Sequence, residues 1–164
     1  MRISLALLLA ASSVVLLSPL KAAAQSDPVS LTGLTVISVV VEDVPSAVSR
    51  AGLSTSALQA DAERTLKQAG ITVTTDSDAY LYIHILVSES SAAQPLPYFV
   101  EVSLMQEITL PRNVKSRTPL QAPTWTVNRL GTVSPDQLKA TLGGRVTQFV
   151  DEFVKAFRAV NPKG

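Results

Sequence analysis

The chain predicts an α+β fold, in which an antiparallel sheet of about four strands carries two helices on one face, in the order β-α-β-β-β-α. Three observations support this fold class. Apolar residues recur at helical spacing over 55–69 and again over 135–160. Four other segments are rich in β-branched residues or alternate apolar and polar side chains. The last three of these segments are joined by proline-containing loops without a helical crossover, which indicates an antiparallel meander.

The first half of the domain is predicted as a strand followed by a capped helix. Residues 34–42 are apolar on both faces, which is typical of an interior strand covered by helix, and 44–53 is expected to be a loop with room for one helical turn. Ser54 or Thr55 is suited to cap the helix over 55–69. Gly70 should end it, because glycine allows the left-handed turn after which Ile71 folds back onto the last turn.

Three strands are predicted to follow a short extended segment at 71–75. Residues 79–88 form the first of them, and 98–110 show the clearest alternation of apolar and polar side chains in the chain. A proline-rich loop is expected over 111–123. The third strand is predicted over 124–130, with Gly131 ending it.

The closing helix has the strongest start signal. Ser134-Pro135-Asp136-Gln137 combines a cap, a proline at the first helical position and a glutamine placed to reach back. Phe149, Phe153 and Phe157 recur every four residues and should lie on the sheet, near the inward side chains of the 98–110 strand. The glycine pair at 143–144 suggests a close approach to the sheet or a local bend.

The amino-terminal segment reads as an export signal. Arg2 precedes an apolar run over 3–17, and the small residues Ala22-Ala23-Ala24 offer a cleavage site, so we expect a signal peptide over 1–24 and a mature chain that begins at Gln25. An uncleaved anchor is the alternative interpretation. Residues 25–33 are polar and are predicted to be a flexible tail, which leaves a single domain over 34–164.

Composition excludes several classes of function. The chain has no cysteine, so it cannot carry a cysteine-linked lipid, a disulfide or a cysteine metal site. Removing Arg2 and Lys21 from its 14 basic residues leaves 12, against 13 acidic ones. A nearly neutral mature chain is not suited to bind nucleic acid. No cofactor motif is present, and none is predicted.

The candidates for catalysis and metal binding are few. His84 is the only histidine, so an envelope hydrolase would have to use it with a serine or a carboxylate, but its place in mid-strand favours a structural role. Asp76 and Asp78 are interpreted as a solvated turn, because no further ligands follow at the spacing of a metal loop. The adjacent carboxylates at 42–43 and 151–152 diverge and are interpreted as surface charge.

Two places are candidates for binding. Tyr80, Tyr82 and His84 share one face of a strand and could stack on a sugar or an aromatic ligand, although burial under a helix is the favoured interpretation. A loop with three basic residues could contact anionic lipid, lipopolysaccharide phosphate or peptidoglycan carboxylate, the alternative being a solvated hairpin tip. Its basic residues are Arg112, Lys115 and Arg117.

Several segments carry a resemblance to known proteins. They are LKQAGI, AYLYIHILV, YFVEVSLMQEITL, TWTVNRLG and FVDEFVKAFRAVNP. With these segments the chain resembles a group of small exported bacterial α+β proteins, and its layout is similar to that of the small lipoprotein partner of the outer-membrane lipopolysaccharide translocon. The resemblance implies a place in the cell envelope and assigns no role to any single residue.

The sequence therefore predicts an exported, non-enzymatic binding or accessory protein of the bacterial envelope, periplasmic or secreted after cleavage near Ala24. Its partner would be an envelope component or another protein, held through loops or an exposed sheet edge. Membrane contact would be limited to the signal peptide or the periphery. The alternatives are a hydrolase that uses His84 and a homodimer made by pairing of sheet edges.

Overall fold

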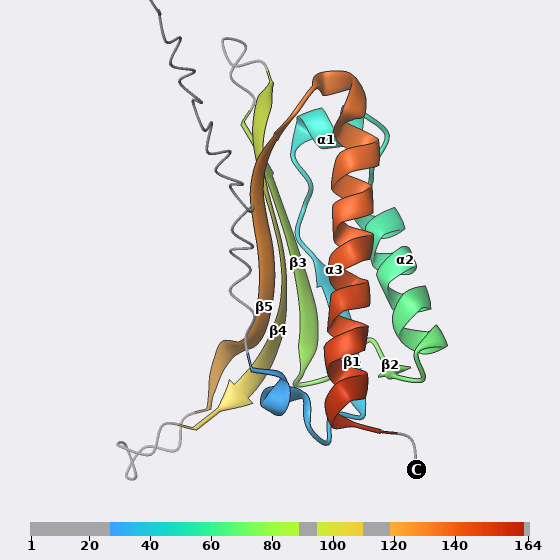
Figure 1. Ribbon diagram of the computed structural model, residues 1–164, viewed down its shortest axis with the longest axis vertical. Helices are drawn as coiled ribbons and strands as arrows, with labels where there is room; N and C mark the ends of the chain where they lie inside the picture. The colour runs from blue at the N-terminus through green and yellow to red at the C-terminus, as the bar shows by residue number, and fades with distance from the viewer. Residues whose placement is uncertain (1–26, 89–94, 110–118, 163–164) are drawn as a thin grey trace, which may run out of the picture.

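A computed structural model describes residues 27–88, 95–109 and 119–162 (Figure 1). The chain folds into a five-stranded mixed sheet with helices on one face. The strands are β1 (Val36–Val41), β2 (Thr72–Val73), β3 (Tyr80–Val87), β4 (Leu96–Ile108) and β5 (Leu120–Val133), in the spatial order β2-β1-β3-β4-β5. The helices are α1 (Ser46–Arg50), α2 (Thr55–Gln68) and α3 (Leu138–Val160), with 3-10 turns η1 (Pro28–Leu31) and η2 (Pro135–Gln137).

The α+β class and the meander of the last three strands are as predicted, but the sheet is not wholly antiparallel. Strands β3, β4 and β5 pair antiparallel, whereas β1 is parallel to both β2 and β3. Helix α2 lies between β1 and β3 in the chain, and such a crossover lets the two strands run in the same direction. The segment predicted as a short extended entry supplies β2, the fifth strand.

Helices α2 and α3 lie side by side on one face of the sheet and bury their apolar stripes there (Figure 1). The predicted end of α2 is confirmed in detail. Gly70 adopts a φ of 86°, Ile71 N–H donates to Leu66 O at 3.1 Å, and Gly70 N–H donates to Lys67 O at 3.0 Å. This pattern satisfies the last carbonyls of the helix and buries Ile71 against it. Within the described ranges, no helix is long and apolar enough to cross a membrane.

The start of α3 differs from the expected capping box. Pro135–Gln137 forms a 3-10 turn in which Gln137 N–H donates to Ser134 O at 3.0 Å. The side chain of Gln137 donates to Asp136 Oδ2 at 3.1 Å instead of reaching back to the backbone. The Ser134 hydroxyl and then the Gln137 amide hold the pKa of Asp136 below its usual value. The polar residues before α3 therefore bond to one another, and the regular helix begins at Leu138.

The glycine pair in α3 does not approach the sheet, so that expectation is wrong. A Cβ added to Gly143 would lie 3.6 Å from Leu53 Cδ1, an ordinary contact, and one added to Gly144 would meet nothing within 4 Å. The surroundings of Gly144 give no packing reason for glycine.

Strand β5 is longer at both ends than predicted. It includes Pro123, which was assigned to the preceding loop, and it continues through Gly131, which was expected to end it. The register shifts at Pro123, because Trp125 pairs with Leu104 whereas Pro123 pairs with Met105. Proline fits there because β5 is an edge strand and the shift marks a β-bulge.

Gly131 is required for packing, not for a turn. Tyr98 lies opposite it on β4 and is buried. A Cβ on Gly131 would lie 2.8 Å from the Tyr98 ring. The glycine therefore makes room for the aromatic ring of its cross-strand neighbour.

Residues 27–33 are part of the domain, which corrects the prediction of a flexible tail for this part of 25–33. Leu31 at the end of η1 is completely buried. The side chain of Asn161, at the end of α3, donates to Leu31 O at 2.8 Å and accepts from Gly33 N–H at 2.8 Å. These bonds fasten the start of the described chain to its last helix.

The aromatic core lies between α3 and the sheet. Phe149 and Phe153 are buried as predicted, and Phe157 is only partly buried. The ring of Phe153 meets that of Trp125 edge to face, with centroids 5.2 Å apart. The closing helix therefore packs on β5 as well as on the predicted β4.

Candidate functional site

The sheet has a second face, which the helices leave uncovered (Figure 1). On β3 the buried residues Leu81, Ile83 and Ile85 point toward the helices, so the residues that alternate with them point away. The strand register extends this alternation to the neighbouring strands. We call the resulting surface the helix-free face; it comprises Ser38, Val40, Glu42, Tyr80, Tyr82, His84, Leu86, Phe99, Glu101, Ser103, Met105, Glu107, Thr126, Asn128 and Leu130.

The predicted binding residues Tyr80, Tyr82 and His84 all lie on the helix-free face, where they are half-buried by their neighbours. The favoured interpretation of the sequence, that they are buried under a helix, is wrong. The alternation in β3 shows two faces but does not say which one the helices cover. The second interpretation, that they stack on a sugar or an aromatic ligand, stays a prediction.

Cross-strand register arranges the helix-free face in rows. Leu86, Phe99 and Leu130 are paired in one row across β3, β4 and β5. The next row is polar and contains His84, Glu101 and Asn128, with Glu42 beside His84. The third contains Val40, Tyr82, Ser103 and Thr126. An apolar row therefore runs directly beside an acidic one.

The apolar side chains of this face are unusually accessible. Leu86 is 51% exposed, Leu130 75% and Val40 42%. Scattered exposed aliphatic residues are common, but these share one surface with the aromatic rings of Tyr82 and Phe99. The arrangement is typical of a surface that contacts another molecule.

Glu42 and its neighbours form the polar centre of the face. The hydroxyl of Tyr82 donates to the Glu42 carboxylate, and His84 Nε2 lies 3.3 Å from Glu42 Oε2. Accepting this hydrogen bond, the Glu42 carboxylate raises the pKa of Tyr82 to about 12, with desolvation adding to the effect. The His84 ring also meets the edge of Phe99, with centroids 6.3 Å apart. His84 is thus held among Glu42, Tyr82 and Phe99.

The second carboxylate, Glu101, bonds to hydroxyl groups. Ser103 Oγ lies 3.1 Å from a Glu101 carboxylate oxygen and 3.0 Å from Thr126 Oγ1. Ser103 is buried, with 1% of its surface exposed. Its hydroxyl is therefore engaged with these two neighbours and does not point toward His84 as a nucleophile would.

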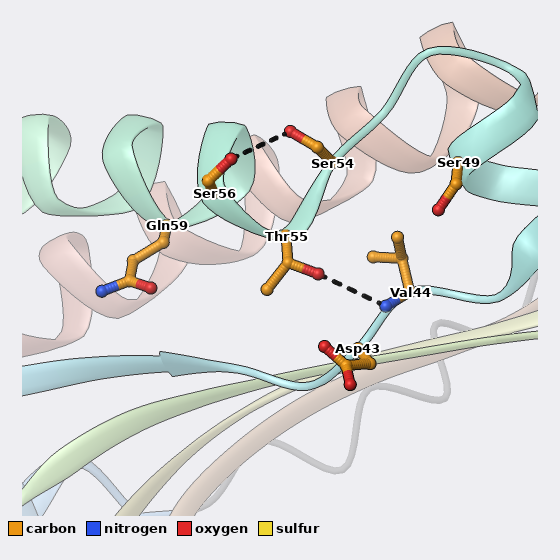
Figure 2. Close-up of a pocket in the computed structure, with 7 residues that line it drawn as sticks. All are labelled: Asp43, Val44, Ser49, Ser54, Thr55, Ser56 and Gln59. Atoms are coloured by element: carbon orange, nitrogen blue, oxygen red, sulfur yellow. Dashed lines mark hydrogen bonds between the residues drawn. The ribbon is translucent and has the colours of Figure 1, made fainter.

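A separate depression lies where the loop after β1 meets the start of α2 (Figure 2). Hydroxyl groups gather in it, but they have structural partners. Ser54 Oγ accepts from Ala57 N–H at 3.2 Å and caps α2, and Thr55 Oγ1 accepts from Val44 N–H at 3.4 Å. Asp43 is the carboxylate at this opening. The residues that line it include no histidine, lysine or arginine, so Asp43 is its one ionisable side chain among the described residues.

The other candidates from the sequence are a metal site, the basic loop and the export signal. Over residues 27–88, 95–109 and 119–162, no group of three or more His, Asp or Glu residues could hold a metal ion. The basic residues Arg112, Lys115 and Arg117 and the signal predicted over 1–24 lie outside the described residues. Sequence reasoning missed Val40, Glu42, Leu86, Phe99, Glu101 and Leu130 as parts of one surface. Their own strand patterns carried a signal, but only the register brings them together.

No protein-family model and no curated protein matches the sequence. Two solved structures are similar in outline. One is a PelC dodecamer from Paraburkholderia phytofirmans, with a TM-score of 0.41 and 12% identity over 76% of this chain and 86% of that chain. The other is a minor lipoprotein from Acinetobacter baumannii, with a TM-score of 0.36 and 13% identity over 78% of this chain and 95% of that chain. At these values neither similarity identifies a family or a function for the chain.

Proposed function

We propose that the chain is an exported, non-enzymatic binding or accessory protein of the bacterial cell envelope, and that it holds its partner on the helix-free face. The observation that carries the proposal is the apolar row of Leu86, Phe99 and Leu130, with two of its three side chains at least half exposed. Covering such side chains is favourable by roughly 25 cal/mol for each Å² removed from water. The loops and the sheet edge expected from the sequence become secondary contacts in this proposal.

The compartment is part of the same proposal. The basic, apolar and small-residue segments over 1–24 have the order of a cleavable signal, which supports release into the periplasm or the medium. The exported protein should therefore begin at Gln25. Amino-terminal sequencing of protein recovered from the periplasm tests this point, and an intact Met1 in the membrane fraction would contradict it.

The geometry around His84 favours a binding protein over the alternative hydrolase. His84 lies on an open sheet face beside Glu42, and the hydroxyl-lined depression at the start of α2 does not include it. The nearest row of the face contains the Ser103 hydroxyl, which is buried and bonded elsewhere. We therefore expect His84→Ala to alter binding or stability without abolishing a chemical step. A hydrolytic activity that disappears in this variant, with folding unchanged, would favour the enzyme.

The test of the binding surface is co-purification from the native envelope. The exported protein is purified from its own cells as the parent and as the double variant Leu86→Ser/Leu130→Ser, and the bound material is quantified by mass spectrometry. Both leucines are exposed, so the substitutions should change the free energy of unfolding by less than about 1 kcal/mol. We expect the double variant to lose most of the co-purifying partner.

The control places serine at two exposed positions on the helix side. Gln68 on α2 and Ala140 on α3 are both exposed, and Gln68→Ser/Ala140→Ser should retain the partner. Equal loss in both double variants, or no loss in either, would argue against the helix-free face as the binding surface. If the partner is a second copy of this chain, the parent should sediment as a dimer and the leucine variant as a monomer.

A further inference from the structure

The charged side chains of the helix-free face in the described residues are acidic, apart from His84. Glu42, Glu101 and Glu107 lie on it, whereas its residues in the described part of the chain include no lysine and no arginine. On α2, Arg64 pairs with Asp61 and Lys67 with Glu63. On the helix-free face, His84 is the neighbour of Glu42 that can carry a positive charge, with its Nε2 at 3.3 Å from the carboxylate. The face is therefore apolar and acidic together.

The strand register gives the spacing between the two glutamates and between their row and the apolar row. Glu42 and Glu101 belong to one row and lie on either side of β3, so their backbones are about 10 Å apart at two strand spacings. The apolar row of Leu86, Phe99 and Leu130 is two residues further along the strands, about 7 Å away. A molecule laid across the strands would meet both rows at once.

Resting on the proposed function, we infer that the partner presents an amphipathic, positively charged helical segment of polypeptide to the helix-free face. Residues seven apart on a helix are separated by about 10.5 Å along its axis and share one side. Two lysines or arginines at that spacing match Glu42 and Glu101. Leucine-like residues on the adjoining stripe of such a helix would cover Leu86, Phe99 and Leu130.

Electrostatics favours a positively charged helix over an anionic lipid or a second copy of this chain. Covering Glu42 and Glu101 with a neutral or anionic surface would take two carboxylates out of water without supplying a lysine or arginine to pair with either, which is costly. An anionic lipid would add repulsion to that cost. A second copy placed face to face would bring the same three glutamates and, from the described part of its face, no lysine or arginine to pair with these carboxylates.

The test uses synthetic peptides and the purified exported protein. The first probe is a fluorescent 16-residue helical peptide of leucine and alanine with two lysines seven residues apart beside a leucine stripe. The second carries glutamates in place of the lysines, and the third carries its lysines four residues apart. Fluorescence anisotropy gives the dissociation constant of each. We expect the first peptide to bind most tightly and the glutamate peptide least.

The protein variants test the same point from the other side. Glu42→Gln/Glu101→Gln keeps the size of both side chains and one acceptor oxygen on each, and should weaken binding of the first peptide about fivefold to tenfold. Asp151→Asn/Glu152→Gln removes the same charge from α3 and should leave that affinity unchanged. Raising the salt concentration should weaken binding to the parent, a measurement that does not depend on any variant folding. Far-ultraviolet circular dichroism checks the fold of both variants.

Three results would overturn the inference. One is equal affinity for the lysine and glutamate peptides. Another is unchanged peptide binding in Glu42→Gln/Glu101→Gln. The third is binding of the parent to phosphatidylglycerol vesicles that Leu86→Ser/Leu130→Ser abolishes, which would identify an anionic lipid instead.

The co-purification assay separates failure of this inference from failure of the proposed function. If the native partner is lost with Leu86→Ser/Leu130→Ser but kept with Glu42→Gln/Glu101→Gln, the result supports the helix-free face as the binding surface. It contradicts the inference that the partner presents a positively charged helix. If the partner survives both changes, both proposals fail.

Discussion

The pairing of α3 with the sheet predicts a large loss of stability on replacing Phe153 with alanine. Phe153 is fully buried. Its ring and that of Trp125 are in edge-to-face contact, with their centroids 5.2 Å apart. Removing a buried phenylalanine side chain costs about 3 to 5 kcal/mol. Loss of the aromatic contact, about 0.5 to 1.5 kcal/mol by itself, places Phe153→Ala in the upper part of that range. A small domain has about 5 to 15 kcal/mol in total, so the variant should be close to unfolding.

Urea unfolding followed by tryptophan fluorescence measures this directly, because Trp125 is the only tryptophan in the chain and is itself buried against Phe153. Phe157→Ala is the matched control. It removes the same atoms four residues along the helix from a side chain that is only partly buried, and should cost clearly less. If Phe153→Ala unfolds at the same urea concentration as the parent, or if the two variants lose equal stability, the packing described for α3 is wrong.

Three further predictions follow from individual positions. Gly144→Ala should raise the free energy of unfolding by about 0.5 to 1 kcal/mol, since it replaces a mid-helix glycine in open space; a lower urea midpoint would contradict this. Gly131→Ala should lower it by about 1 to 3 kcal/mol, because the added Cβ would meet the Tyr98 ring at 2.8 Å, and a neutral result in the same assay would show that the ring moves aside freely. Tyr82 should ionise at about pH 12, so the Glu42 hydrogen bond contributes stability below about pH 10 that is lost as the pH rises through about 12. Glu42→Gln should move this ionisation to lower pH in an ultraviolet absorbance titration, and an unchanged titration curve would refute the interaction.

Local signals in the sequence were sufficient for most of the secondary structure. The apolar spacing over 55–69 predicts the helix, and its Schellman-type end follows from Gly70, because no other residue adopts a φ of 86° at so little cost. The alternation over 79–88 and 98–110 gave β3 and β4 to within two residues of their ends. The parallel pairing of β1 with β3 was also accessible, since a helix lies between them in the chain.

The remaining errors concern interactions between distant parts of the chain. Leu31 gave no periodic signal, yet it belongs to the hydrophobic core, and Asn161, 130 residues later, donates to its carbonyl group. Pro123 and Gly131 are residue types that usually interrupt a strand. Pro123 is acceptable because β5 is an edge strand, and Gly131 because it makes room for the ring of Tyr98. Strand propensity describes a residue in isolation. Whether these residues belong to a strand depends on their position in the sheet and on the side chains of the neighbouring strand.

The candidate site was predicted only in fragments for the same reason. The alternation in β3 placed Tyr80, Tyr82 and His84 on one face but gave no indication of which face the helices cover. The contributions of Glu42 and Glu101 depend on strand register, which joins residues 59 positions apart in the sequence. A one-residue change of register would have moved one of them to the core side of the sheet.

Site-specific photo-crosslinking in living cells tests the central claim, that the helix-free face is the surface on which the partner binds. A photoreactive phenylalanine derivative is placed at Leu86 on that face and, in a separate strain, at Gln68, which is exposed on α2. We predict that irradiation links the chain at Leu86 to one defined polypeptide and that Gln68 gives no such product. Crosslinks to the same polypeptide from Gln68 and none from Leu86 would contradict the claim and move the binding surface to the helices.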